Sequence, residues 1–204
     1  GSLWIGTARG LLRRKDGQDQ LLTEKSGLPR DFIMSLHESA DGSLWVGTSN
    51  GAGRVQGETV TALDLAPMDG AQDVFGIHED ADGTLWFATD RGLVRYRSGQ
   101  LGIVGARQGL PVDAVFQVVV DAYGNFWLSS NAGVVYVVRE AMEAAANGSV
   151  DRVDYQQFAE ADGFIEDELA QHFPTLLPEL RALRSRTRLL KKSLPASQGV
   201  LQSS

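Results

Sequence analysis

The sequence predicts an all-β protein made of repeated antiparallel sheets. The first observation is that the four tryptophans stand 41 residues apart in the phrases LWIGT, LWVGT, LWFAT and FWLSS: Trp4, Trp45, Trp86 and Trp127. The second is that a glycine follows each tryptophan by six residues: Gly10, Gly51, Gly92 and Gly133. A fixed period of this length indicates one supersecondary unit copied along the chain, each copy burying its apolar surface against its neighbours.

The first strand of a unit is predicted by apolar residues two positions apart, since side chains of a strand alternate between its faces. The pairs are Met34 and Leu36, Phe75 and Ile77, and Phe116 and Val118. A turn follows at Asp41-Gly42, Asp82-Gly83 and Tyr123-Gly124, because glycine adopts positive φ without steric cost.

The second strand carries the tryptophan. Its alternation places Leu44, Val46 and Thr48 on one face, and Trp45 and Gly47 on the other. The position two after the tryptophan is always small, which predicts close contact between sheets; it is occupied by Gly6, Gly47, Ala88 and Ser129.

Two further strands complete each unit. Turns at Asn50-Gly51, Arg91-Gly92 and Ala132-Gly133 lead into third strands, and fourth strands follow in QLLTEK, TVTALDL and QLGIVGA. Four strands in about 41 residues is the size of a β-propeller blade. The sequence therefore predicts a β-propeller fragment of about four four-stranded blades. Because no tryptophan is followed by aspartate, blades of the WD type are disfavoured.

The predicted domain organisation is a partial propeller over residues 1–164, with units at about 1–26, 27–66, 68–107 and 109–158. The alanine-rich insert from Arg139 to Ser149 predicts a short exposed helix near 139–147. Because the chain begins inside a unit, we expect it to be a piece of a larger protein.

A non-repeat tail, helical or disordered, is predicted over 165–204, because Arg181 stands where a further tryptophan is due. The basic stretch from Arg181 to Lys192 leaves three alternatives: a helix for a membrane surface or nucleic acid, a product of a shifted reading frame, or an ordinary docked or frayed helix.

The repeated phrase resembles the two-component regulator propeller repeat. Gly-Leu-Pro, an apolar strand, Asp-Gly-x-Leu-Trp-x-Gly-Thr and Gly-Leu-x-Arg carry the likeness, which extends to Phe164. The last unit departs from the pattern at Tyr123, Ser129-Ser130 and Tyr136. The resemblance implies a noncatalytic periplasmic sensing segment of a membrane-anchored receptor with a histidine kinase or diguanylate cyclase output. It also implies a small-molecule, glycan or peptide ligand and a homodimer formed through the parent receptor.

Composition is consistent with this class of protein. The 204 residues are 43% hydrophobic and carry a formal charge of −7, which argues against nucleic acid as the main partner. The absence of cysteine excludes disulfides and thiolate metal sites. No apolar stretch approaches the roughly twenty residues that span a bilayer, so membrane attachment is expected only through the parent protein.

The sequence contains no convincing catalytic, metal or cofactor site. His37 and His78 occupy equivalent repeat positions, so a blade-to-blade step separates them and a shared metal or acid-base pair is disfavoured. His172 lies in the tail, and Asp80-x-Asp82-Gly83 is interpreted as a turn. The residues singled out are structural repeat positions, namely the four tryptophans and four glycines above with Asp41 and Asp82. No ligand-binding residue is assigned.

Three arginines recur nine residues after the tryptophan: Arg13, Arg54 and Arg95. They predict either ion pairs at the outer or inter-blade surface or a basic lining that meets an anionic ligand.

Two other functions stay open. One is a propeller enzyme resembling the streptogramin lyases, which also contain an Asp-Gly-x-Trp phrase. Those enzymes tend to have Trp-Phe-Thr-Glu and a catalytic histidine on a face loop, whereas His37 and His78 fall in predicted strands. The other is a passive protein-interaction scaffold.

Overall fold

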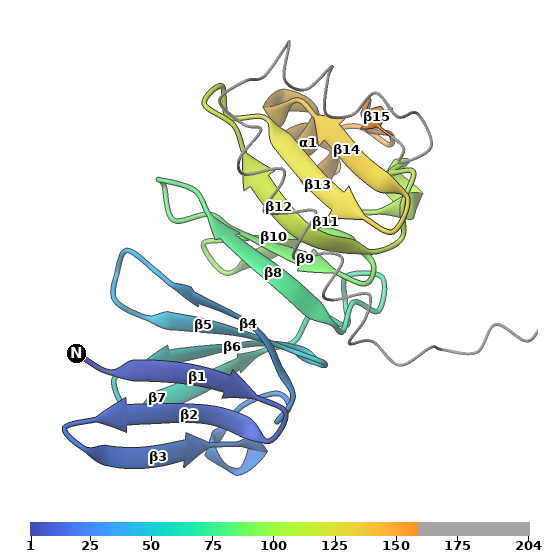
Figure 1. The fold of residues 1–204 in the computed structure, drawn as a ribbon. Coiled ribbons are helices and arrows are strands. Elements are labelled where there is room, and N and C mark those ends of the chain that lie inside the picture. Colours follow the sequence, from blue (N-terminus) through green and yellow to red (C-terminus); the bar gives the residue numbers. More distant parts are fainter. Residues whose placement is uncertain (159–204) are drawn as a thin grey trace, which may run out of the picture.

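The structure is a computed structural model that describes residues 1–158. Over these residues the chain folds into four antiparallel sheets that follow one another in chain order (Figure 1). The predicted all-β architecture of blade-like sheets with one short helix is thereby confirmed. The predicted tail at 165–204 and the end of the family phrase at Phe164 lie outside the described residues.

Each sheet is a simple meander, because its strands pair in sequence order. The first sheet contains β1 (Leu3–Thr7), β2 (Gly10–Lys15) and β3 (Gln18–Leu22). The second contains β4 (Ile33–Glu38), β5 (Leu44–Thr48), β6 (Gly51–Gln56) and β7 (Thr59–Leu63). The third contains β8 (Val74–Glu79), β9 (Leu85–Thr89), β10 (Gly92–Arg97) and β11 (Gln100–Val104). The fourth contains β12 (Val115–Val120), β13 (Phe126–Ser130), β14 (Gly133–Val137) and β15 (Gln156–Phe158).

The connections between sheets contain short 3-10 turns. η1 (Glu24–Ser26) leads from the first sheet to the second, and η2 (Ala106–Gln108) leads from the third to the fourth. Both end at a glycine in the left-handed conformation, Gly27 and Gly109, which any other residue would adopt only with strain. These glycines open the Gly-Leu-Pro phrases of the repeat.

A β-bulge interrupts each complete first strand, at Met34, Phe75 and Phe116. A bulge adds one unpaired residue and breaks the simple alternation of side chains. The prediction that Met34 and Leu36, and their counterparts, share one face is therefore wrong. The bulge instead brings neighbouring sheets together, since the rings of Phe75 and Phe116 meet edge to face at 5.3 Å between centroids.

The tryptophan-bearing faces of the second and third sheets pack on the sheet that follows each of them. The Trp45 ring lies 5.7 Å from Phe87 and 5.6 Å from Tyr96, both in the third sheet. The Trp86 ring lies 4.7 Å from Phe126 in the fourth sheet. These aromatic pairs fix the stacking of successive sheets.

The small residue beside the tryptophan allows the sheets to approach closely. A Cβ atom added at Gly47 would lie 2.6 Å from the carbonyl oxygen of Val74 in the next sheet, closer than real Cβ contacts. The predicted close contact is thus present at this position, and any larger side chain would force the sheets apart.

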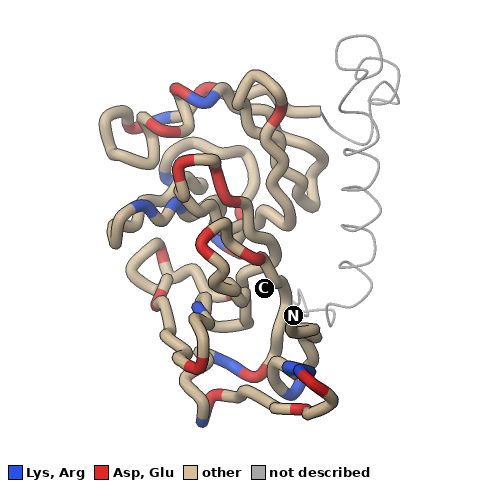
Figure 2. The backbone as a smooth tube through the Cα atoms, turned by 90° about the vertical axis from the view of Figure 1, so that its left-hand side faces the viewer, with Lys and Arg blue, Asp and Glu red and all other residues tan. Residues whose placement is uncertain are grey.

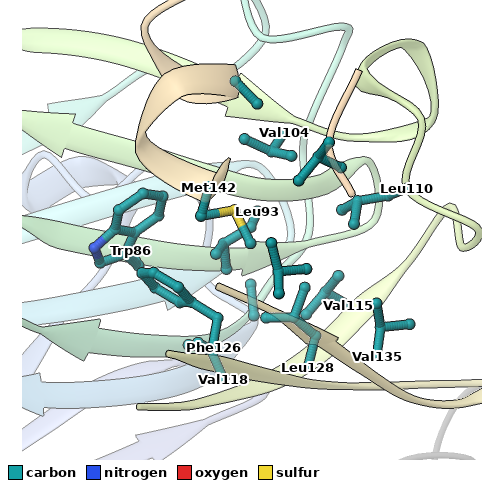
Figure 3. Close-up of a cluster of buried hydrophobic side chains, with 14 of the residues drawn as sticks. Trp86, Leu93, Val104, Leu110, Val115, Val118, Phe126, Leu128, Val135 and Met142 are labelled. Carbon is teal, nitrogen blue, oxygen red and sulfur yellow. The ribbon is translucent and has the colours of Figure 1, made fainter. Parts of the chain in front are cut away.

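Helix α1 (Arg139–Ala146) replaces the last hairpin turn, between β14 and β15, and completes the largest apolar core (Figure 3). Met142, Ala145 and Ala146 are buried in this core with Trp86 and Phe126. The prediction of an exposed helix is therefore wrong, because one face of the insert packs on the third sheet beside β11. None of the helices within residues 1–158 is long and apolar enough to cross a membrane.

Candidate functional site

Antiparallel pairing aligns three repeat positions in a cross-strand row on the tryptophan face of each complete sheet. The rows are His37, Trp45 and Arg54 in the second sheet, His78, Trp86 and Arg95 in the third, and Val119, Trp127 and Tyr136 in the fourth. Directly opposed residues share a face of the sheet. The polar ends of the first two rows therefore lie on the face that packs against the following sheet.

His37 joins the second sheet to the third. Its Nε2 lies 2.9 Å from Oε2 of Glu79, which also accepts a hydrogen bond from the backbone N–H of Ala40. Burial alone raises the pKa of Glu79, but the hydrogen bonds from His37, Ser39 and Ala40 outweigh it and hold that pKa below its usual value. His37 is thus committed to an inter-sheet contact.

The equivalent His78 contacts a carboxylate of its own sheet. Its Nε2 lies 3.3 Å from Oδ1 of Asp80, while Nε1 of Trp86 donates to Oδ2 of Asp80 at 2.8 Å. Arg139, at the start of α1, donates to both oxygens of Asp80 from Nη1 and Nη2, at 2.9 and 2.8 Å. This fork-shaped pair fastens the inserted helix to the third sheet.

Asp80 is ionised by these partners. Burial raises the pKa of its carboxyl group, but the hydrogen bonds from His78, Arg139 and Trp86 together hold the pKa well below its ordinary value. All of them donate to the ionised carboxylate, so Asp80 has a structural part at the interface. Within residues 1–158, no three His, Asp or Glu side chains are arranged to hold a metal ion.

Two of the three recurring arginines form ion pairs with the next sheet. Nη1 of Arg13 donates to Oε1 of Glu58, and Nη1 of Arg95 donates to Oε2 of Glu143 on α1, each at 2.7 Å. Arg54 instead donates from Nη2 to Oδ2 of Asp41 in its own sheet, at 2.5 Å. The inter-blade alternative therefore describes Arg13 and Arg95, and Arg54 is the exception.

The structural repeat positions lie where the strands turn and pack. Trp45, Trp86 and Trp127 are buried and Trp4 is half-buried. The four glycines open the third strands at positive φ. Asp41 and Asp82 accept the backbone N–H of Ser43 and Thr84 and pair with Arg54 and Arg97.

Four charged partners were not identified from the sequence: Glu58, Glu79, Arg139 and Glu143. Each contacts a residue of a different sheet, and a repeat pattern specifies pairing within a sheet but not the opposition of two sheets. One signal in the sequence could have identified Glu58. The same repeat position is occupied by Glu58 in one unit and by Gly99, which has no charge, in the next. Figure 2 shows acidic and basic residues interspersed along the described chain.

Two stretches of the chain, residues 27–50 and 70–91, match the family model of the two-component regulator propeller. They cover the first and second strands of the second and third sheets. No curated protein matches the chain.

Solved structures with the same fold include an extracellular domain of a two-component system and a lyase. One is the extracellular domain of a hybrid two-component system from B. thetaiotaomicron, with a TM-score of 0.63 and 19% identity. Another is a catalytically inactive virginiamycin B lyase from Staphylococcus aureus with quinupristin, with a TM-score of 0.56 and 18% identity. The alignments cover 79% of this chain in both cases, but 22% of the first protein and 53% of the second.

At these identities the structural matches establish the fold alone, and this chain spans only part of the length of each protein. The family match adds the kind of repeat. The chain therefore carries two-component regulator propeller repeats, folded as consecutive blades of a β-propeller.

Proposed function

We propose that this chain is a noncatalytic ligand-sensing segment of a bacterial signal-transduction receptor, located in the periplasm. The observation that carries the proposal is the match of residues 27–50 and 70–91 to the two-component regulator propeller. The fold likeness to an extracellular domain of a two-component system supports it.

The chemistry of the interfaces also supports a binding module. His37 is engaged with Glu79, and His78 with Asp80, in contacts that hold sheets or turns. Binding would then fall to the loops and sheet ends, which a rigid scaffold presents. A ligand with different affinity for two arrangements of a dimeric receptor would shift their populations and so signal to a kinase or diguanylate cyclase output.

The test is a calorimetric screen of the protein against glycans, peptides and small metabolites. We expect at least one compound to bind, to raise the unfolding temperature and to be recovered unchanged. A ligand at a hundredfold excess over its Kd adds about 2.7 kcal/mol to the free energy of unfolding. Absence of binding across the panel, or conversion of a bound compound into a product, would contradict the proposal.

A lyase is the second candidate, because the virginiamycin B lyase shares the fold. Its direct test is incubation of the protein with quinupristin followed by mass spectrometry. We expect the compound to remain intact. Ring opening that is abolished by His78→Ala would reverse the ranking of the two functions.

Pull-down of a protein partner that needs no small molecule would favour a passive scaffold instead.

A further inference from the structure

The three recurring arginines differ in the partner of Nη1. Nη1 of Arg13 and Nη1 of Arg95 each donate to a carboxylate of the following sheet, at 2.7 Å. Arg54 donates from Nε to Oγ of Ser43 and from Nη2 to Asp41. Among residues 1–158, no carboxylate of the following sheet is paired with Nη1 of Arg54. The second interface thus lacks an acceptor that the first and third interfaces supply.

The cause is a substitution in the turn opposite Arg54. Glu58, which pairs with Arg13, stands thirteen residues after Trp45 in the β6–β7 turn. The equivalent position of the β10–β11 turn is Gly99, which has no side chain. A Cβ atom added at Gly99 would meet no atom within 4 Å, although the positive φ of 84° at this position favours glycine.

The guanidinium of Arg54 is oriented and accessible. It lies over the Trp45 ring, 5.7 Å from the centroid, and its Nε bond to Ser43 fixes its plane. The Arg54 side chain is 35% exposed, against 14% for Arg13 and 6% for Arg95. The half-buried ring of Tyr96, which packs on Trp45, forms the wall on the side of the third sheet.

Asp41 does not close this site. Its carboxylate accepts a hydrogen bond from Nη2 and belongs to the second sheet. The pair is exposed to solvent, where such an ion pair contributes little to the free energy of folding. Among residues 1–158 no partner is found for Nη1 of Arg54, unlike Nη1 of Arg13 and of Arg95. A second acceptor there would form a charge-assisted hydrogen bond of the same kind as those of Glu58 and Glu143.

We propose that Arg54 binds the carboxylate of a small-molecule ligand at the interface of the second and third sheets. The ligand carboxylate takes the place that Glu58 and Glu143 fill at the neighbouring interfaces, with Tyr96 and the Ser98-Gly99 turn beside it. This inference rests on the ligand-sensing function proposed above and adds a ligand class, an organic acid.

The experiment compares glucuronate with glucose, a pair that differs in the carboxylate. The Nε–H resonance of Arg54 and the amide of Gly99 are followed by NMR while each compound is added to the protein. We expect saturable shifts with glucuronate and none with glucose. Equal responses to the two compounds, or no response to glucuronate, would overturn the site.

Two variants and a control make the test specific. Ser98→Gly with Gly99→Glu places the Gly57-Glu58 sequence in this turn, with strain at residue 99, where φ is 84°. The new carboxylate should occupy Nη1 and weaken glucuronate binding at least tenfold. Arg54→Gln should have the same effect on the Gly99 signal, and Arg14→Gln, an exposed arginine of the first sheet, should have none. Unchanged binding in either site variant would overturn the inference. A panel compound that binds Arg54→Gln as tightly as the unmodified protein would support ligand sensing while refuting this site.

Discussion

The first and third sheets contain nearly the same strand, yet one face of that strand is exposed in the first sheet and buried in the third. In β1 the side chain of Ile5 is 40% exposed, whereas Phe87 at the same position of β9 is fully buried. The difference comes from the neighbours, because the second sheet covers the Phe87 face and no described residue forms a sheet over Ile5. The burial of Phe87 is thus decided by the adjacent blade.

The same comparison explains the composition of the tryptophan strands. A blade between two neighbours is covered on both faces, so β5 and β9 are buried along their whole length. Such a strand is apolar on both faces instead of alternating between apolar and polar residues. Charged residues lie in the turns and at the ends of the rows in the second and third sheets, where His37 and Arg95 contact carboxylates of the next sheet.

The sharpest test of this comparison is the pair Phe87→Ala and Ile5→Ala. Phe87 fills the core between the second and third sheets, so its truncation should lower the free energy of unfolding by about 3–5 kcal/mol. Ile5 makes fewer contacts, and its truncation should cost less than about 1 kcal/mol. Urea unfolding followed by tryptophan fluorescence measures both values. Equal losses would show that β1 is covered as fully as β9.

A smaller effect is expected from methyl groups added between sheets. Gly47→Ala places Cβ against the backbone oxygen of Val74, which cannot move without shifting β8, and should cost about 1–3 kcal/mol. For Gly6→Ala the three nearest atoms all belong to side chains, those of Ile33 and Leu36, and none to the backbone, so this change should cost less. Thermal unfolding of the two variants ranks them, and a larger loss for Gly6→Ala would contradict the assignment of the tighter contact to the second interface.

The smallest effect concerns the link between Asp80 and α1. Arg139→Gln removes the two charged hydrogen bonds to Asp80 and should cost about 1–2 kcal/mol near neutral pH, since the pair is partly exposed. The folded-state pKa of Asp80 lies below its unfolded value, so its contribution is complete above about pH 4 and declines on acidification.

The penalty of Arg139→Gln should therefore shrink as the pH falls below that value. Arg97→Gln, which removes an exposed pair with Asp82, is the matched control and should show a smaller loss. A penalty for Arg139→Gln that is independent of pH would mean that the loss comes from the contacts of Arg139 with Gly124 and Phe126 and not from Asp80.

The repeat period made the strands and turns predictable, because the Trp45 phrase and its copies specify local geometry. The register within a first strand was not predictable, since the bulges at Met34, Phe75 and Phe116 interrupt the alternation from which it was inferred. The position of α1 was missed for a related reason: alanine content predicts a helix but not the surface that its face covers. At the interface, the arginines were visible in the sequence and their partners were not, because opposition between sheets leaves no periodic signal.

Helix α1 has a consequence for cooperativity. It belongs to the fourth sheet but is bonded to the third through Arg95 with Glu143 and Asp80 with Arg139, and it shares their core. In a linear array, stability is a sum of terms within units and between neighbours. An insert that spans two units strengthens one coupling above the others, so these two sheets should open together in native-state hydrogen exchange, as a single foldon.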